Sequence, residues 1–318
     1  MDTYPSAWAP EPFPEVPLLP GGPDGPGPEP GGHGPVRANI ARVYDAWLGG
    51  KDNYSVDRAL AAEVAERTPW VPAATRANRD FLVRVVEFLT RAGVGQFLDI
   101  GTGLPTARNV HEVARDIVPD VRVVYVDNDP VVHRHAQALL AGQDGVSALR
   151  ADARDPASVL EQASGAGGLD LSRPVGVLFV AVLHFLTRDD DPAGVVGTFR
   201  DALPAGSFLA VSHATGTRGR GGAAMREAVR VYREQVVPVV PRDRAEILRL
   251  FDGWELVPPG LVGIDRWQPV TERRGGTRVP VLGGVARSPA RPRRDAPGRG
   301  GPVVGTGSSG GGTIMRGG

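Results

Sequence analysis

The sequence predicts a doubly wound α/β domain, in which helices cover both faces of a mostly parallel β-sheet. Three observations lead to this prediction. From residue 96 onward, short apolar segments of strand length alternate with segments of helical periodicity. The strand segments are largely apolar throughout, which is typical of strands buried on both faces. The chain before residue 96 carries helical patterns only, so a helical extension precedes the sheet.

Each element is expected from its own pattern. In the segment 73–92, Phe81, Val85 and Leu89 recur at helical spacing and share one face. The segment 175–183, "VGVLFVAVL", is apolar from end to end, as a central strand is. We expect strands at 96–100, 121–127, near 146–151, at 175–183, at 207–213, near 261–267 and at 279–286. We expect helices at 38–48, 56–66, 73–92, 105–117, 130–141, 156–163, 192–203, 221–236 and 242–252.

The two ends of the chain differ in composition from its middle. Residues 1–36 are rich in Pro and Gly and carry five acidic residues but no Lys or Arg, whereas residues 288–318 are rich in Gly, Pro and Arg. Neither end has apolar periodicity, so burial cannot offset the entropy cost of ordering it. We therefore expect disordered tails at 1–36 and 288–318 around one domain at 37–287. The basic tail is too short and too poor in aromatic residues to predict nucleic-acid binding.

Composition excludes several classes of protein. The chain has 318 residues, 41% of them hydrophobic, which is enough for one large core. It has no Cys, which excludes disulfides, thiolate metal sites and a cysteine nucleophile. The first residues lack the basic and apolar regions of a signal peptide, and the apolar run at 175–183 is far shorter than the ~20 residues that cross a bilayer. We expect a cytoplasmic protein that does not insert into membranes.

Acidic residues follow the first three expected strands, where a doubly wound sheet binds its ligands. A pyrophosphate is a poor fit, because Asp99 stands two residues before the first glycine of the loop and would repel it. Thr106 also occupies the place of the third glycine of a dinucleotide-binding loop. An NAD-dependent oxidoreductase is therefore disfavoured.

S-adenosylmethionine fits the same row of residues. It has no phosphate, and its cationic amino group would be attracted by Asp99. Asp127 can accept hydrogen bonds from both ribose hydroxyls, and Asp152 can accept one from the adenine amino group. Pro105 is expected to be the first residue of the next helix, a position that suits proline. The residues predicted to bind the cofactor are Asp99, Gly101, Thr102, Gly103, Asp127, Asn128, Asp152 and Ala153.

Several long motifs resemble one family. They are "NIARVYDAWLGGKDNYSVDR", "RANRDF", "FLDIGTGLPTARNVHEVA", "VVYVDNDPVV", "AVLHFL" and "GSFLAVSHAT". They are similar to a bacterial family of class I S-adenosyl methyltransferases, and the resemblance runs from Arg37 to Arg287. It implies a Rossmann-like sheet of seven strands and transfer of a methyl group from S-adenosylmethionine. It implies no particular acceptor.

Two histidines are the candidate catalytic residues. His184 and His213 follow neighbouring strands and could converge above the methyl group, where a histidine can act as a general base near neutral pH. In the other interpretation, each is a partly buried histidine that hydrogen bonds to a loop. His111, His133 and His135 are expected at the surface, so we predict no metal site.

A polar and aromatic turn follows the first expected helix. Its Gly-Gly pair at 49–50 resembles the hinge of a lid. The residues predicted to close over the cofactor or to line the acceptor pocket are Tyr44, Asp45, Lys51, Asn53 and Tyr54. In the other interpretation, Gly49 merely ends a helix and Lys51 is solvated.

Taken together, the residues predict an S-adenosylmethionine-dependent methyltransferase that acts on a small-molecule acceptor. Neither a nucleic acid nor a membrane is expected as a partner. The alternative is a non-catalytic sensor or regulatory protein that binds S-adenosylmethionine and keeps the fold, because no compelling general base stands out. The sequence identifies neither the acceptor nor the oligomeric state.

Overall fold

A central sheet organises the computed structural model, which describes residues 38–106, 108–140, 142–216, 220–235, 237–268 and 279–290. Seven strands lie side by side in the order β3-β2-β1-β4-β5-β8-β6, and β7 pairs with β8 beside this path. The first five are parallel, and β8 is antiparallel to β5, so the sheet is mostly parallel. The strands are β1 (Gln96–Ile100), β2 (Arg122–Asp127), β3 (Val146–Arg150), β4 (Gly176–Val180), β5 (Phe208–Ala214), β6 (Glu255–Leu256), β7 (Val262–Gly263) and β8 (Val281–Arg287).

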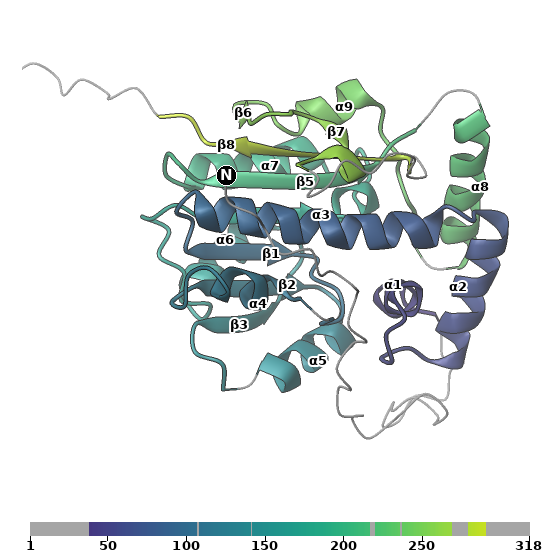
Figure 1. Cartoon of the computed structure of the whole chain (residues 1–318), viewed down its shortest axis with the longest axis horizontal. Coiled ribbons are helices and arrows are strands. Elements are labelled where there is room, and N and C mark those ends of the chain that lie inside the picture. Colours follow the sequence, from purple (N-terminus) through teal and green to yellow (C-terminus); the bar gives the residue numbers. More distant parts are fainter. Residues whose placement is uncertain are drawn as a thin grey trace, which may run out of the picture.

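Helices cover both faces of the sheet. Helices α3, α4 and α5 pack on one face, and α6, α7 and α9 pack on the other. Helices α1, α2 and α8 gather at one end of the sheet (Figure 1). The helices are α1 (Ile40–Leu48), α2 (Ser55–Arg67), α3 (Val71–Arg91), α4 (Val110–Arg115), α5 (Pro130–Leu140), α6 (Pro156–Ser164), α7 (Pro192–Ala202), α8 (Arg220–Gln235) and α9 (Arg244–Arg249). Within the described ranges, none of these helices is long and apolar enough to cross a bilayer.

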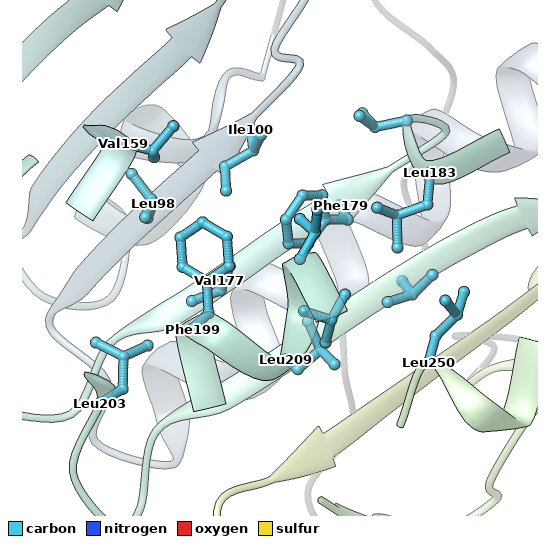
Figure 2. Close-up of a cluster of buried hydrophobic side chains, with 14 of the residues drawn as sticks. Leu98, Ile100, Val159, Val177, Phe179, Leu183, Phe199, Leu203, Leu209 and Leu250 are labelled. Atoms are coloured by element: carbon cyan, nitrogen blue, oxygen red, sulfur yellow. The ribbon is translucent and has the colours of Figure 1, made fainter. Parts of the chain in front are cut away.

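Alternation along the strands divides the core into two layers. In β1, Leu98 and Ile100 pack toward α6 and α7, whereas Phe97 packs toward α3. Figure 2 shows the first layer, in which Phe179 lies near Phe199 of α7. Asp99 has the same parity as Phe97, so its side chain belongs to the α3 side. Because side chains alternate along β1, the Asp99 carboxylate, which is predicted to bind the cofactor, faces α3.

The helix expected at 105–117 is wrong at its start. Helix α4 begins at Val110, and Pro105 lies in the loop before it rather than at the first helical position. The Asn109 amide donates to the Glu112 carboxylate at 2.7 Å, and Asn109 Oδ1 accepts from the Thr106 amide at 3.1 Å. This local cap at Asn109 competes with the proline signal and fixes the start of the helix five residues later.

The strand expected at 175–183 is too long. Strand β4 ends at Val180, because Ala181 has a positive φ of 62° and the chain turns there into the short 3₁₀ helix η1 (Leu183–Phe185). The Ala181 amide donates to Ser212 Oγ at 2.8 Å, which holds the turn against β5. His184 therefore lies in η1 and not at a strand end.

The remaining expected elements agree with the structure to within a few residues, apart from the last part of the chain. The strand expected near 261–267 is the two-residue β7 followed by the 3₁₀ helix η2 (Ile264–Arg266), and β6 was not predicted. The tails expected at 1–36 and 288–318 lie outside the described residues, except for 288–290. Ser288 is buried and donates its amide to the Ser207 carbonyl, so the sheet contacts continue one residue past the predicted boundary at 287.

Candidate cofactor and acceptor site

A cavity of about 410 Å³ opens at the carboxyl ends of the parallel strands. The loops after β1, β2, β3 and β4 form one side of it, and α1, α3 and α8 form the other. Its volume is in the range of small-molecule sites, about 300–1,000 Å³. The predicted site residues that line it are Tyr44, Asp45, Asp99, Gly101, Thr102, Gly103, Asp127, Asn128, Asp152, Ala153 and His184. Lys51, Asn53, Tyr54 and His213 do not line it.

Asp99 is buried under α3. Its carboxylate accepts a hydrogen bond from Thr102 Oγ1 at 3.1 Å. Burial raises its pKa to about 6, although the nearby guanidinium of Arg79 and the Thr102 hydroxyl act in the opposite direction. A cationic group bound here would replace the water that this carboxylate has lost.

Asp127 is held at the end of β2 by backbone amides. Its Oδ2 accepts from the Gly103 amide at 3.0 Å, and its Oδ1 accepts from the Asp129 amide at 2.9 Å. These contacts join the loop after β1 to the loop after β2, and they orient the carboxylate. Burial raises the pKa of Asp127, with the backbone hydrogen bonds acting against the shift.

Asp152 forms a surface ion pair beside the same cavity. It binds Arg154 through a contact of 2.6 Å from Nη2 to Oδ2. The hydrogen bond from Arg154 is the main reason why the pKa of Asp152 lies below its usual value. A carboxylate has about four lone-pair sites, so this pairing still leaves Asp152 able to accept a hydrogen bond from a ligand.

One face of α1 and the facing surface of α8 form the apolar end of the cavity. Tyr44, Asp45 and Leu48 of α1 line it together with Trp47, because residues three and four apart share a helix face. Trp70 and Tyr232 complete the aromatic wall, and the rings of Trp47 and Tyr232 lie 6.2 Å apart. Chain segments separated by more than 180 residues in sequence meet at this end.

The polar turn after α1 is tied down. Gly49 has a φ of 79° and caps α1, so the alternative interpretation of this glycine is the one that the structure supports. Asp45 Oδ2 accepts from the Asp52 amide at 3.0 Å and from Asn53 Nδ2 at 2.7 Å. Lys51 is exposed, and the ring of Tyr54 lies under the Arg42 guanidinium at 4.9 Å. The turn therefore supports the cavity from behind through Asp45.

A chain of hydrogen bonds fixes Tyr44. Ser212 Oγ donates to Asn78 Oδ1 at 2.5 Å, and Asn78 Nδ2 donates to the Tyr44 hydroxyl at 3.0 Å. The Tyr44 hydroxyl in turn lies 3.3 Å from the Thr75 carbonyl, to which it donates. Ser212 Oγ already accepts from the Ala181 amide, so its own proton is free to be donated to Asn78. Asn78 then accepts through Oδ1 and donates through Nδ2 to Tyr44.

The two predicted catalytic histidines face different surroundings. His184 lines the cavity, and its Nδ1 accepts from the Ala214 amide at 3.4 Å, which leaves the proton on Nε2. Burial, with His213 and Arg242 nearby, holds the pKa of His184 well below its usual value, so the ring is neutral. His213 is fully buried on the other face of β5 from Ser212. Its Nδ1 is 2.7 Å from the Ala214 carbonyl, and its Nε2 is 3.0 Å from Arg242 Nη1.

Sequence reasoning missed the cavity residues on α3. Thr75, Asn78, Arg79 and Leu82 line the cavity at spacings of three and four, and Arg79 places a guanidinium near Asp99. Three of these four side chains are polar and recur at helical spacing. A polar stripe of this kind beside the apolar face of the helix could have indicated in the sequence that α3 lines a site. His111 was also misplaced, since it is buried and bonded to the Tyr125 hydroxyl at 2.8 Å. Within the described residues, no three His, Cys, Asp or Glu side chains gather as a metal site would require.

The fold and the cavity together define a class of protein. A doubly wound sheet of this strand order, with acidic residues at the carboxyl ends of its first strands, is that of the class I methyltransferases. The family model of the S-adenosyl methyltransferases matches residues 35–289. The chain belongs to this family and is an S-adenosylmethionine-dependent methyltransferase.

Two solved structures are similar to the chain over most of its length. One is a protein from Thermobifida fusca assigned as a methyltransferase, with 41% identity over 80% of this chain and 96% of that chain, and a TM-score of 0.75. The other is a DUF574 family protein from Streptomyces avermitilis, with 40% identity over 80% of this chain and 98% of that chain, and the same TM-score of 0.75. Among curated proteins, none matches the chain.

The residues of the cavity fit S-adenosylmethionine. Gly101 and Gly103 both have a positive φ, and a Cβ on Gly101 would lie 2.5 Å from Val182 Cγ2, so the loop needs glycine there. Thr106 Oγ1 is buried at the cavity without a hydrogen-bond partner among the described residues, which is expected where a bound molecule supplies one. The hydrogen-bond acceptors that line the cavity include several carboxylates, which suits a cofactor that carries a sulfonium and an amino group.

Proposed function

We propose that this methyltransferase acts on a small molecule bound inside the cavity. One observation carries the proposal: the strand-end carboxylates and the aromatic wall of α1 and α8 line one continuous cavity. An acceptor held at the aromatic end would share an enclosed space with the cofactor. The cavity, at about 410 Å³, has a volume that suits a small molecule.

In our proposal, different residues of this chain bind different parts of the cofactor. Asp127 would accept from the ribose hydroxyls, and Asp152 with Ala153 would bind the adenine. Asp99 would pair with the amino group of the methionine part, and Arg79 with its carboxylate. S-adenosylmethionine supplies an electrophilic methyl group on a sulfonium. The chain then has to orient the acceptor and exclude water, which α1 and α8 do at the aromatic end.

His184 has a different role in this proposal from the one that the sequence suggested. Its Nδ1 accepts from a backbone amide and its Nε2 carries the proton, so the neutral ring can donate a hydrogen bond into the cavity. A ring in that state is a poor general base, since its basic nitrogen is occupied. His213 would serve the structure, because both of its ring nitrogens contact buried groups.

A binding measurement on Asp127 tests the cofactor site. We expect Asp127→Ala to weaken binding of S-adenosylhomocysteine by about tenfold to a hundredfold in calorimetry, because two hydrogen bonds to a charged group are lost. The control is Asp144→Ala, which removes an exposed carboxylate outside the cavity and should leave the affinity unchanged. Equal affinity in Asp127→Ala and the control would refute the assigned ribose contact.

A second measurement separates an enzyme from a sensor. The protein is incubated with a bacterial extract and with S-adenosylmethionine that carries a labelled methyl group. Mass spectrometry then detects any methylated small molecule. We expect a product that depends on the protein. Tight binding of S-adenosylhomocysteine without any product, over repeated extracts, would favour the sensor. The bacterial origin and cytoplasmic location expected from the sequence stay predictions.

A further inference from the structure

Asp45 lies at the aromatic end of the cavity and has no cationic partner among the described residues. It is 3% exposed and lines the same cavity as Tyr44. Its Oδ2 takes two hydrogen bonds from the turn behind it, while no donor among the described residues reaches its Oδ1. Burial raises its pKa to about 6, as for a carboxylate whose lost hydration is not replaced by a cation.

Tyr44 offers the same kind of contact as Asp45. Its oxygen accepts from Asn78 Nδ2, and its proton points to the Thr75 carbonyl. The remaining lone pair can only accept. Two consecutive residues of α1 that line the cavity therefore each have an oxygen that can accept a hydrogen bond from a bound molecule.

The charges that line the cavity point to a cation as well. Arg79 and Arg154 are the guanidinium groups of its described wall, and Arg154 is paired with Asp152. They face five carboxylates: Asp45, Asp99, Asp127, Asp129 and Asp152. S-adenosylmethionine brings only one net positive charge, so the loaded cavity stays acidic. Such a field attracts cations and repels carboxylates and phosphates.

From these contacts we propose that the acceptor is a small amine, bound as its cation by Asp45 and the rings of Tyr44, Trp47 and Tyr232. A cationic nitrogen has no free lone pair, so in this proposal Asp45 takes one proton from it before the nitrogen accepts the methyl group that S-adenosylmethionine supplies, with S-adenosylhomocysteine as the other product. This rests on the proposed function and names the substrate class of the same site. A cation over the face of an aromatic ring gains further stabilisation, more so when water is excluded. The apolar remainder of the acceptor would pack against Leu48 and Trp70, which line the same end.

The test compares three probes of nearly equal shape in the presence of saturating S-adenosylhomocysteine. They are 2-phenylethylamine, 2-phenylethanol and 3-phenylpropionate, which are cationic, neutral and anionic at neutral pH. Calorimetry measures the binding of each. We expect the amine to bind at least about tenfold more tightly than the alcohol, and the acid to bind most weakly. Asp45→Asn should remove the preference for the amine.

Asp52→Asn is the matched control, since the Asp52 side chain lies in the same turn and outside the cavity. It should keep the preference for the amine. Melting curves establish that both variants fold. The inference is overturned if the acid binds as tightly as the amine, if the amine fails to bind at millimolar concentration, or if Asp45→Asn keeps the preference.

Two further outcomes concern binding of the cofactor rather than of the acceptor, and the experiment distinguishes them from the outcomes above. If S-adenosylhomocysteine itself does not bind to the unaltered protein, the proposed function fails before any probe is added. If Asp45→Asn instead weakens S-adenosylhomocysteine about tenfold and leaves the probes unchanged, Asp45 serves the amino group of the cofactor. That result would overturn the amine acceptor and leave the proposed function intact.

Discussion

At the scale of the residue, three carboxylates that line the cavity are buried, so that their ionisation is costly until a cation arrives. Asp99 and Asp45 both have a pKa raised to about 6 by burial, and the pKa of Asp127 is raised for the same reason. Burial disfavours the charged form of an acid, and a bound cation restores it. Cofactor binding should therefore release protons near this pH.

This gives a pH prediction for Asp99. As the pH falls from about 7 to about 5, Asp99 becomes protonated and the affinity for S-adenosylhomocysteine should fall by about tenfold, while the cofactor's amino group stays charged. In Asp99→Asn the change should shrink to what Asp127 contributes. Calorimetry at several pH values measures both. An affinity that does not vary with pH in the unaltered protein would contradict the prediction.

The raised pKa of Asp99 also makes the stability of the free protein depend on pH, in the opposite direction from the cofactor affinity. The folded protein holds the Asp99 proton more tightly than the unfolded chain does. The free energy of unfolding of the free protein therefore decreases as pH rises from the usual aspartate pKa to about 6, and it levels off above that.

At the scale of the element, α1 is held over the cavity by a buried ion pair to α2 together with the apolar contacts of Val43 and Trp47. Arg42 Nε lies 2.7 Å from Asp57 Oδ2 of α2, with side-chain exposures of 8% and 0%. Asp57 also accepts from the backbone amides of Asn39 and Tyr54, at 2.8 and 2.9 Å. One carboxylate thus joins the start of α1 to the start of α2.

We predict that Asp57→Ala destabilises the protein by about 3 kcal/mol, because it leaves Arg42 charged and buried without this partner. Urea denaturation measures the change. Glu234→Ala is the control, since it breaks an exposed pair with Arg230 and should cost less than about 1 kcal/mol. Binding of S-adenosylhomocysteine should also weaken in Asp57→Ala, because α1 lines the cavity. A variant as stable as the control would show that α1 is held by its apolar contacts alone.

At the scale of the whole molecule, the packing of α7 on the sheet lies apart from the candidate cavity, although Ile100, Val182 and Leu186 of the same layer line that cavity. Phe199 of α7 is fully buried against Phe179, with ring centroids 5.6 Å apart, on the side of the sheet away from α3. It does not line the cavity. Stability and cofactor affinity should therefore respond to different substitutions.

Phe199→Ala tests this separation. We expect a loss of about 4 kcal/mol in the free energy of unfolding, because a large side chain leaves a cavity in a close-packed layer. Phe199→Leu fills most of the space and should cost about 1 kcal/mol. At 25 °C both variants should bind S-adenosylhomocysteine as the unaltered protein does. A large loss of affinity in Phe199→Ala would show that the two regions are coupled.

Most of the fold could be predicted because its signals are local. Strands β1, β2 and β5 differ from the expected ranges by at most one residue at either end, since mostly apolar segments mark them. The start of α4 after Asn109 and the end of β4 before Ala181 could not be predicted from hydrophobic periodicity alone. The first depends on a side-chain cap, and the second on a positive φ supported by a hydrogen bond from the neighbouring strand.

The sequence by itself determined the class of sheet, the glycine loop and the row of carboxylates at its edge, because each depends on residues that are neighbours in the chain. Only the tertiary structure decided what faces that row. It brought Arg79 near Asp99 and joined α1 to α8 around an aromatic end. These contacts depend on packing between distant segments, for which a single sequence carries no periodic signal.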